Sequence, residues 1–583
     1  YLAIDPYRCD LGKMCCSPVK RDSCKTKCGD HSYCLTKFAY FCDSMKKIWL
    51  HVIVVLASLV FFSQCAKKGN PSGGPKDSIP PIIVKSNPEN YSSNFTGDEI
   101  RIYFDEFIKL KDLQQNLVVS PPLKYQPVIT PITSAKVLKI KILDTLRDNT
   151  TYVFNFGKSI VDNNEENEFD YFKYVFSTGD YIDSLKVEGK VSDALKPQLE
   201  GKATVMLYEA SEEFNDSIVF QEKPYYITTT KDNDPSFELT NLKEGNYVMI
   251  ALQEESNNYI FEPKKDKIGF IQEFITVPVD SAASFQLTLF EETPNYRLTR
   301  PSHVSKHKIA FGFEGEIDSL TIEPMFELPE GYVSKTLRDP KKDSLNYWFK
   351  PAFDMEVTDT LTFLAKNIGL IDTLEVRLRD LYADSLQVSL KGGGTLTPKD
   401  TVRFQSNTPL VKADVEKLTI MDQDSLFLEK QLVLDEKNNE ALLLFDKKDE
   451  NTYQIKALPE AFTDFFENTT DTLEYTLRTK PASDYGTIDF TLSGIESFPV
   501  IVELLNEKFQ VVTSEYLEEN KAVSFTYLVP NKYYLRIIYD ANGNKQWDTG
   551  NFLLKTQPEK VVYYPSQIEV RSNWSLNENF ILE

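Results

Sequence analysis

The stretch Leu138-Lys-Ile-Lys-Ile-Leu143 alternates apolar and charged residues with a period of two, which predicts a β-strand that buries one face. Similar runs, rich in β-branched and aromatic residues, recur at Glu99-Ile-Arg-Ile-Tyr-Phe104, Thr151-Tyr-Val-Phe-Asn-Phe156 and Tyr533-Tyr-Leu-Arg-Ile-Ile538. Only two stretches, 109–115 and 460–466, are compatible with short helices. The sequence therefore predicts an all-β protein.

The length of the chain predicts several domains. About 520 residues follow Cys65, and at about 100 to 150 residues per domain they make four or five domains. We expect a tandem array of β-sandwiches. The predicted units span 81–179, 180–298, 299–385, 386–480 and 481–583.

An internal repeat links the second unit with the last. The stretch 242–262 aligns without gaps on 528–548. In each copy a turn containing Leu leads to Tyr247 or Tyr533 and then into a strand. An acidic, amide-rich turn follows the strand, and after it comes an aromatic residue with an acid. The two units are therefore expected to share one fold.

Two family resemblances support this reading. The residues from Pro81 to Thr178 resemble an S-layer-type bacterial Ig-like domain, through Ser86-Asn-Pro88, Leu146-Arg-Asp-Asn-Thr-Thr-Tyr152 and Val175-Phe-Ser-Thr-Gly179. Each repeat copy resembles the transthyretin-like, carboxypeptidase-regulatory class of β-sandwich, in which a Phe-x-Leu stretch and a Gly-x-Tyr turn are typical. The second copy departs from that pattern, because Asn531 stands at the glycine position.

A lipoprotein signal is predicted near the start. Met45-Lys-Lys47 is followed by an apolar run to Ser63 and then by Cys65, and the run is shorter than the roughly 20 residues of a spanning helix. Cys65 would be acylated as the first mature residue. Gln64 departs from the small residue usual before the cleaved bond, so plain cleavage or an uncleaved anchor are the alternatives.

The chain on either side of this signal differs in composition. Residues 1–44 carry seven cysteines and the chain after Cys65 carries none. We expect 1–44 to be a non-native extension ahead of the signal at 45–64; a disulfide-rich or zinc-binding mini-domain is the alternative. Residues 65–80 are rich in Gly, Pro and Ser and predict a flexible tether. From Cys65 onward the chain resembles a Bacteroidota family of Ig-like envelope lipoproteins with such a tether.

The charge excludes one class of partner. From Cys65 onward there are 56 Lys and Arg against 82 Asp and Glu, a net charge of −26. An acidic surface repels nucleic acid and anionic lipid headgroups, so membrane attachment would have to come from the lipid.

The C-terminal unit carries a candidate Ca²⁺ loop. Asp540, Asn542, Asn544 and Asp548 follow the every-second-residue spacing of an EF-hand-like loop. Lys545 stands where that loop favours glycine, and Asn551 stands where it favours a bidentate Glu. The alternative is a β-hairpin in which Asn542-Gly543 forms a tight turn and Asp540 caps it. No other cofactor is predicted.

Catalysis is not expected. The chain after Cys65 has only two histidines, His303 and His307, and both are expected in a polar linker. At a separation of four they could share a metal on a helix, but Pro301 and the flanking strands favour a loop.

The sequence thus predicts a non-enzymatic, lipid-anchored envelope protein that presents β-sandwiches for protein binding, adhesion or complex assembly. It is expected at the periplasmic face of the outer membrane, because the stretch after Cys65 lacks an acidic surface-export signal. The alternative is a carbohydrate-binding accessory lipoprotein of a polysaccharide-uptake system. It rests on aromatic residues expected to be exposed: Tyr225, Tyr226, Trp348, Tyr563 and Tyr564.

Overall fold

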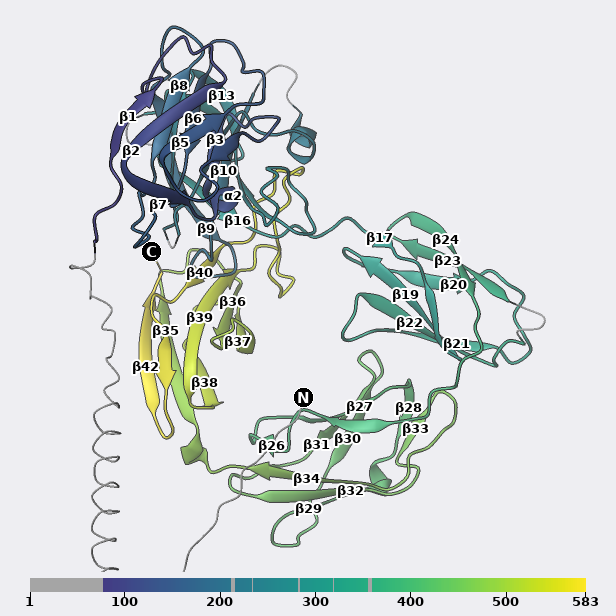
Figure 1. Cartoon of the computed structure of the whole chain (residues 1–583). Helices are drawn as coiled ribbons and strands as arrows, with labels where there is room; N and C mark the ends of the chain where they lie inside the picture. Colours follow the sequence, from purple (N-terminus) through teal and green to yellow (C-terminus); the bar gives the residue numbers. More distant parts are fainter. Residues whose placement is uncertain are drawn as a thin grey trace, which may run out of the picture. The chain divides into compact units, whose positions relative to one another are not determined.

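A computed structural model describes residues 77–210, 215–232, 234–280, 284–317, 319–354 and 359–582. Almost all of the regular structure is β-strand (Figure 1), and the described α-helix, α2 (Leu113–Asn116), has four residues. The all-β prediction is therefore confirmed. The predicted signal, Cys65 and most of the tether lie outside the described residues. Within those residues no helix is long and apolar enough to cross a membrane.

The first sandwich packs a five-stranded sheet against a three-stranded one. The first sheet has the order β1-β2-β5-β4, with β7 also paired to β2, and the second has the order β3-β6-β8. Ring side chains such as Phe104, Phe154 and Phe176 are buried between the sheets. The strands are β1 (Ile83–Asn87), β2 (Glu99–Leu110), β3 (Val118–Ser120), β4 (Val128–Thr130), β5 (Ala135–Lys141), β6 (Thr151–Asn155), β7 (Ile160–Asp162) and β8 (Lys173–Ser177).

The second and the last sandwich have the same topology. The small sheets are β12-β9-β16 and β38-β35-β42, and in each the final strand runs parallel to the first. The large sheets are β11-β10-β13-β14 with β15, and β37-β36-β39-β40 with β41. The repeat seen in the sequence is therefore a repeat of the whole sandwich.

The strands of the second sandwich are β9 (Leu185–Asp193), β10 (Thr204–Glu209), β11 (Tyr226–Thr229), β12 (Ser236–Leu242), β13 (Gly245–Gln253), β14 (Lys267–Phe270), β15 (Ile275–Val277) and β16 (Phe285–Leu289). Those of the last sandwich are β35 (Gly486–Ser493), β36 (Val500–Leu505), β37 (Val511–Leu517), β38 (Val523–Leu528), β39 (Asn531–Tyr539), β40 (Val561–Tyr563), β41 (Ile568–Val570) and β42 (Ser575–Ile581).

Two further sandwiches lie between these copies in the sequence. The third has sheets β17-β19-β22-β21, with β18 on β19, and β20-β23-β24. Its strands are β17 (Arg297–Leu298), β18 (Ser302–Ser305), β19 (Lys308–Glu314), β20 (Thr321–Pro324), β21 (Val333–Arg338), β22 (Ser344–Lys350), β23 (Thr360–Asn367) and β24 (Leu370–Arg377).

The fourth sandwich has sheets β25-β27-β31-β30 and β26-β34-β32-β29, with the pair β28-β33 beside them. Its strands are β25 (Val388–Lys391), β26 (Thr395–Leu396), β27 (Val402–Ser406), β28 (Leu410–Ala413), β29 (Leu418–Met421), β30 (Gln431–Asp435), β31 (Glu440–Leu444), β32 (Thr452–Ala457), β33 (Phe462–Asp464) and β34 (Leu473–Thr479).

The helix prediction at 460–466 is wrong, and the one at 109–115 is right only in part. Helix α2 begins at Leu113, because β2 continues to Leu110. Around Phe462 the chain forms strand β33, which pairs with β28 and buries the Phe462 ring. The buried Asp464 carboxylate then accepts the N–H groups of Phe466 and Asn468, so the segment ends in a capped turn.

Candidate functional site

The loop after β39 holds all four residues predicted to bind calcium, and Asp540 organises it. The side chain of Asp540 is 1% exposed. Its Oδ1 accepts the N–H groups of Gly543 at 2.8 Å and Asn544 at 3.1 Å, and its Oδ2 accepts that of Lys545 at 2.8 Å. Asp540 therefore caps a tight turn, as the alternative interpretation requires. The predicted β-hairpin with Asn542-Gly543 as its tight turn is wrong, because the paired strands β39 and β40 are joined by the whole loop 540–560 and not by this turn alone.

The other three predicted ligands meet one another. The Nδ2 groups of Asn542 and Asn544 donate to Asp548 Oδ2 at 2.6 and 2.8 Å. A fifth residue, Glu559, accepts the N–H groups of Ala541 and Asp548. Burial, together with the charges of Asp548 and Asp540, raises the pKa of Glu559. The sequence analysis missed Glu559.

Lys545 does not prevent the tight turn. Its φ is +67°, in the left-handed region that favours glycine, and its Nζ lies 4.9 Å from the centre of the Tyr516 ring. Within the described residues, no group of three or more His, Cys, Asp or Glu side chains is placed to hold a metal ion.

The first copy of the loop keeps three of these hydrogen bonds with different side chains. Glu254 replaces Asp540 and accepts the N–H groups of Asn258 and Tyr259, while Asn258 donates to Glu262. Tyr259, at the position of Lys545, also has a positive φ. Since this copy keeps the conformation with poorer calcium ligands, the conformation alone does not require calcium. Calcium binding by Asp540, Asn542, Asn544 and Asp548 stays a prediction.

Chelation tests this prediction directly. We expect EDTA to leave the melting temperature of the full chain unchanged, because the loop is closed by its own hydrogen bonds. Asp540→Ala should cost about 1 to 2 kcal/mol of unfolding free energy with or without calcium, as the loss of a turn cap. Calorimetric titration with CaCl₂ is the decisive measurement. Micromolar binding that Asp540→Ala abolishes would establish the calcium site instead.

The later part of the same loop packs on the second sandwich. The Phe552 side chain is fully buried, and its ring lies 5.3 Å from that of Phe270 and 6.5 Å from that of Phe220. Polar contacts surround the ring: Lys555 pairs with Asp216, and Gln557 Nε2 donates to the Phe270 carbonyl at 2.9 Å. The two copies of the repeated sandwich therefore form a junction with a buried apolar centre.

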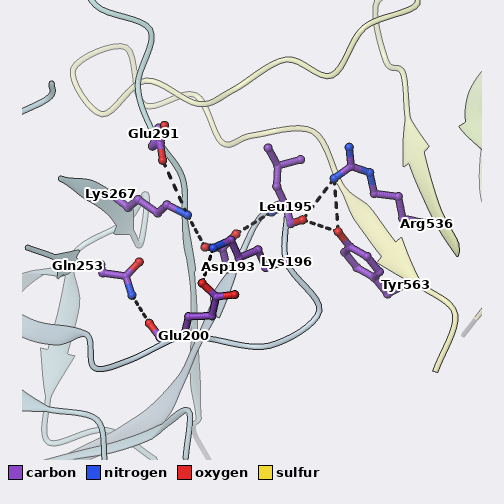
Figure 2. A network of polar contacts seen from close by, with 9 residues as sticks. All are labelled: Asp193, Leu195, Lys196, Glu200, Gln253, Lys267, Glu291, Arg536 and Tyr563. Carbon is purple, nitrogen blue, oxygen red and sulfur yellow. Dashed lines mark hydrogen bonds and ion pairs between the residues drawn. The ribbon is translucent and has the colours of Figure 1, made fainter. Parts of the chain in front are cut away.

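A second contact lies beside this centre, and Figure 2 shows its polar network. Arg536 on β39 and Tyr563 on β40 both donate to the carbonyl of Leu195, Arg536 through Nη1 at 3.3 Å. Arg536 also pairs with Glu503 at 2.6 Å. The Leu195 turn is held by Asp193, which accepts the Leu195 N–H at 2.9 Å.

Asp193 itself forms an ion pair that is removed from solvent. Its Oδ2 lies 2.6 Å from Lys267 Nζ, and the two side chains are 3% and 19% exposed (Figure 2). The carboxylate thus links β9, β14 and the turn that receives Arg536. We refer to the Phe552 centre and this network together as the repeat junction.

The aromatic residues proposed as sugar platforms do not form an exposed surface. Tyr226 and Trp348 are 2% and 3% exposed, which contradicts the prediction for them. The other three are partly buried: Tyr225 packs on Tyr226, Tyr563 belongs to the repeat junction, and the Tyr564 hydroxyl donates to Glu578. The carbohydrate alternative loses its original support.

The histidines are not in a linker as predicted. Residues 302–305 form strand β18, and His303 on it is buried and accepts the Arg379 N–H through Nδ1. The His307 ring lies 5.0 Å from that of Phe466, with the two ring planes tilted by 45°. Burial lowers the pKa of both imidazoles. The His303 side chain packs within the third sandwich, and the His307 side chain packs against Phe466 of the fourth.

Comparisons with known proteins identify the fold family of one part of the chain. Residues 77–178, which include the first sandwich, match the family model of the bacterial Ig-like domain. No curated protein matches the sequence.

Three solved structures illustrate the likeness. Domains 1–6 of the surface layer protein SbsC align over 84% of this chain and 67% of that one, with 9% identity and a TM-score of 0.15. The major pilin subunit BcpA of Bacillus cereus aligns over 68% and 99%, with 10% identity and a TM-score of 0.13. Titin domains A168–A170 align over 48% and 98%, with 10% identity and a TM-score of 0.13. No function follows from these similarities.

Proposed function

We propose that this chain is a non-enzymatic cell-envelope lipoprotein, anchored through Cys65, whose β-sandwiches form a scaffold for protein binding, adhesion or envelope-complex assembly. It would belong with the Ig-like envelope lipoproteins of Bacteroidota that its sequence resembles, and the two repeated sandwiches would be transthyretin-like. The proposed location is the periplasmic face of the outer membrane.

The repeat junction is the observation that carries this proposal. A chain of sandwiches joined only by flexible segments would present its surfaces in variable positions. Here the second and the last sandwich share a buried apolar centre and a network of hydrogen bonds and ion pairs. The first and second sandwiches are also joined, since Ser120 Oγ accepts the buried N–H of Ile227. Such fixed contacts suit a scaffold that holds a partner in one geometry.

The anchor is tested by Cys65→Ser. We expect this variant to leave the membrane fraction, because acylation of Cys65 would supply the hydrophobic attachment once the signal is removed. Fractionation of cells in high salt, with immunodetection of the protein, measures the result. A variant that stays with the membranes would contradict the lipoprotein proposal.

The scaffold role and the location need separate experiments. Chemical cross-linking in cells, followed by purification under denaturing conditions, should return the same envelope protein repeatedly and should lose it in a Phe552→Ala variant. Protease treatment of intact cells should leave the chain uncut if it faces the periplasm. Degradation under that treatment would place it at the cell surface.

A further inference from the structure

A cleft lies between the first and second sandwiches and has no assigned role. Its volume is about 490 Å³, within the range of about 300 to 1,000 Å³ that is usual for small-molecule sites, which often occur at domain boundaries. Strands β6, β8, β9, β11 and β12 contribute to its walls. Its charged lining residues are Lys173, Lys190, Lys202, Lys231, Glu188 and Glu238.

The lysine excess is unusual for a chain with a net charge of −22. The carboxylates in and around the cleft already have partners. Glu188 and Glu238 face each other across β9 and β12, and Lys186 lies 3.2 Å from the first and 3.6 Å from the second. Asp232 lies 3.6 Å from Lys158 and 3.7 Å from Lys202. Asp234 accepts the N–H and the hydroxyl of Ser236.

Two of the lining cations have no such partner. In the described part of the chain, neither Lys190 nor Lys231 makes an ion pair. The Nζ of Lys231 lies 4.7 Å from the centre of the Tyr171 ring, which forms one wall. Lys173 pairs with Glu238 only at 3.9 Å, and burial lowers its pKa. The hydrogen bonds from Ser236 and, after them, the charges of Lys231 and Lys190 lower the pKa of Asp234, so this carboxylate balances part of the positive charge. An anion in the cleft would meet the remainder.

The remaining lining favours a hydroxylated ligand over a bare anion. Side-chain hydroxyl and amide groups line the walls beside the lysines, at Asn116, Asn155, Thr228, Thr229, Thr230, Ser236 and Ser284. These groups can both donate and accept hydrogen bonds, as the hydroxyl groups of a sugar require. Asn116, Asn155, Thr230 and Ser236 already form hydrogen bonds within the protein. In the described residues the hydroxyl groups of Thr228, Thr229 and Ser284 form no such bond, which leaves them for the hydroxyl groups of a ligand.

We propose that this cleft binds an acidic saccharide. Its carboxylate pairs with Lys190 and Lys231, and its hydroxyl groups bond to Thr228, Thr229 and Ser284. This site is independent of the scaffold role proposed above, and it does not use the aromatic residues of the earlier carbohydrate alternative.

Calorimetric titration of the full-length protein in detergent tests this site. The probes are a uronic acid tetrasaccharide, a neutral tetrasaccharide of the same ring size and inorganic phosphate. We expect the acidic tetrasaccharide to bind, the neutral one to bind at least about tenfold more weakly, and phosphate to compete poorly. Raising the salt from low to moderate concentration should weaken the binding, because the charges are partly exposed.

The double variant Lys190→Gln/Lys231→Gln should raise Kd for the acidic tetrasaccharide at least about tenfold. The matched control is Lys139→Gln/Lys141→Gln on β5, which removes the same charge from the first sandwich outside the cleft and should leave Kd unchanged. Circular dichroism and melting curves check that both variants fold. Equal binding of phosphate, an equal loss in the control, or no binding of the acidic tetrasaccharide would each overturn the proposal.

Discussion

Replacing Phe552 by alanine is expected to destabilise the repeat junction by about 3 to 5 kcal/mol, the usual loss for truncating a fully buried phenylalanine. Its ring is enclosed by Phe220 and Phe270, and Lys555 Nζ lies 4.1 Å from the ring centre. Truncation leaves a cavity lined by both copies of the sandwich. Differential scanning calorimetry should show the transitions of the second and last sandwiches lowered by roughly 10 °C or more.

The same loop provides the control. Leu554 is 76% exposed, and Leu554→Ala should change the free energy of unfolding by less than about 0.5 kcal/mol. Hydrogen exchange adds a local measurement: in Phe552→Ala, protection should fall in β14 and in the 549–560 loop. Equal effects of the two substitutions would show that the apolar centre of the junction contributes little.

Asp193→Ala should lower the free energy of unfolding almost as much, by about 3 to 5 kcal/mol, because it leaves the largely buried ammonium of Lys267 without its partner. Lys267 is 19% exposed, and the other carboxylate that pairs with it among the described residues, Glu291, is 3.9 Å away and mostly exposed. The substitution also removes the acceptor for the Leu195 N–H, so the turn that receives Arg536 loosens.

A double-variant cycle separates the charge from the packing. Asp193→Ala/Lys267→Met replaces the orphaned ammonium by an apolar side chain and should recover much of the lost stability. The exposed pair of Glu99 and Arg101 is the comparison, and Glu99→Ala should leave the free energy of unfolding almost unchanged. If Lys267→Met brings no recovery, the cost of Asp193→Ala comes from the turn rather than from the charge.

The sequence predicted the strands and the repeat because both depend on the order of residues within short stretches of the chain. The alternation at 138–141 becomes the two faces of β5, with Leu138 and Ile140 buried and Lys139 and Lys141 exposed. The gapless match of 242–262 with 528–548 becomes a shared topology. The helix at 460–466 failed because pairing with β28 outweighs a weak local preference.

The repeat junction could not be predicted from the sequence in the same way. The match between the copies ends at Asp548, where the loop of the last copy becomes longer: it runs over 540–560, against 254–266 in the first copy. In both copies an acid near the end of the loop accepts the N–H at the end of the match, but it is Asp266 in one and Glu559 in the other. Phe552 lies in the extra stretch beside two exposed leucines, so no periodicity marks it as buried.

The order in which the chain is made gives the Phe552 contact a further consequence. The strands of the second sandwich are complete at Leu289, yet the partner of Glu292 is the N–H of Phe552, 260 residues downstream. At about 5 to 20 residues per second, synthesis of that interval takes roughly 13 to 50 s. During this time the rings of Phe220 and Phe270 are not yet packed against Phe552. A chain truncated before Phe552 would therefore expose an apolar surface that favours aggregation. The third and fourth sandwiches are made within this interval, before the last copy is available to complete the second.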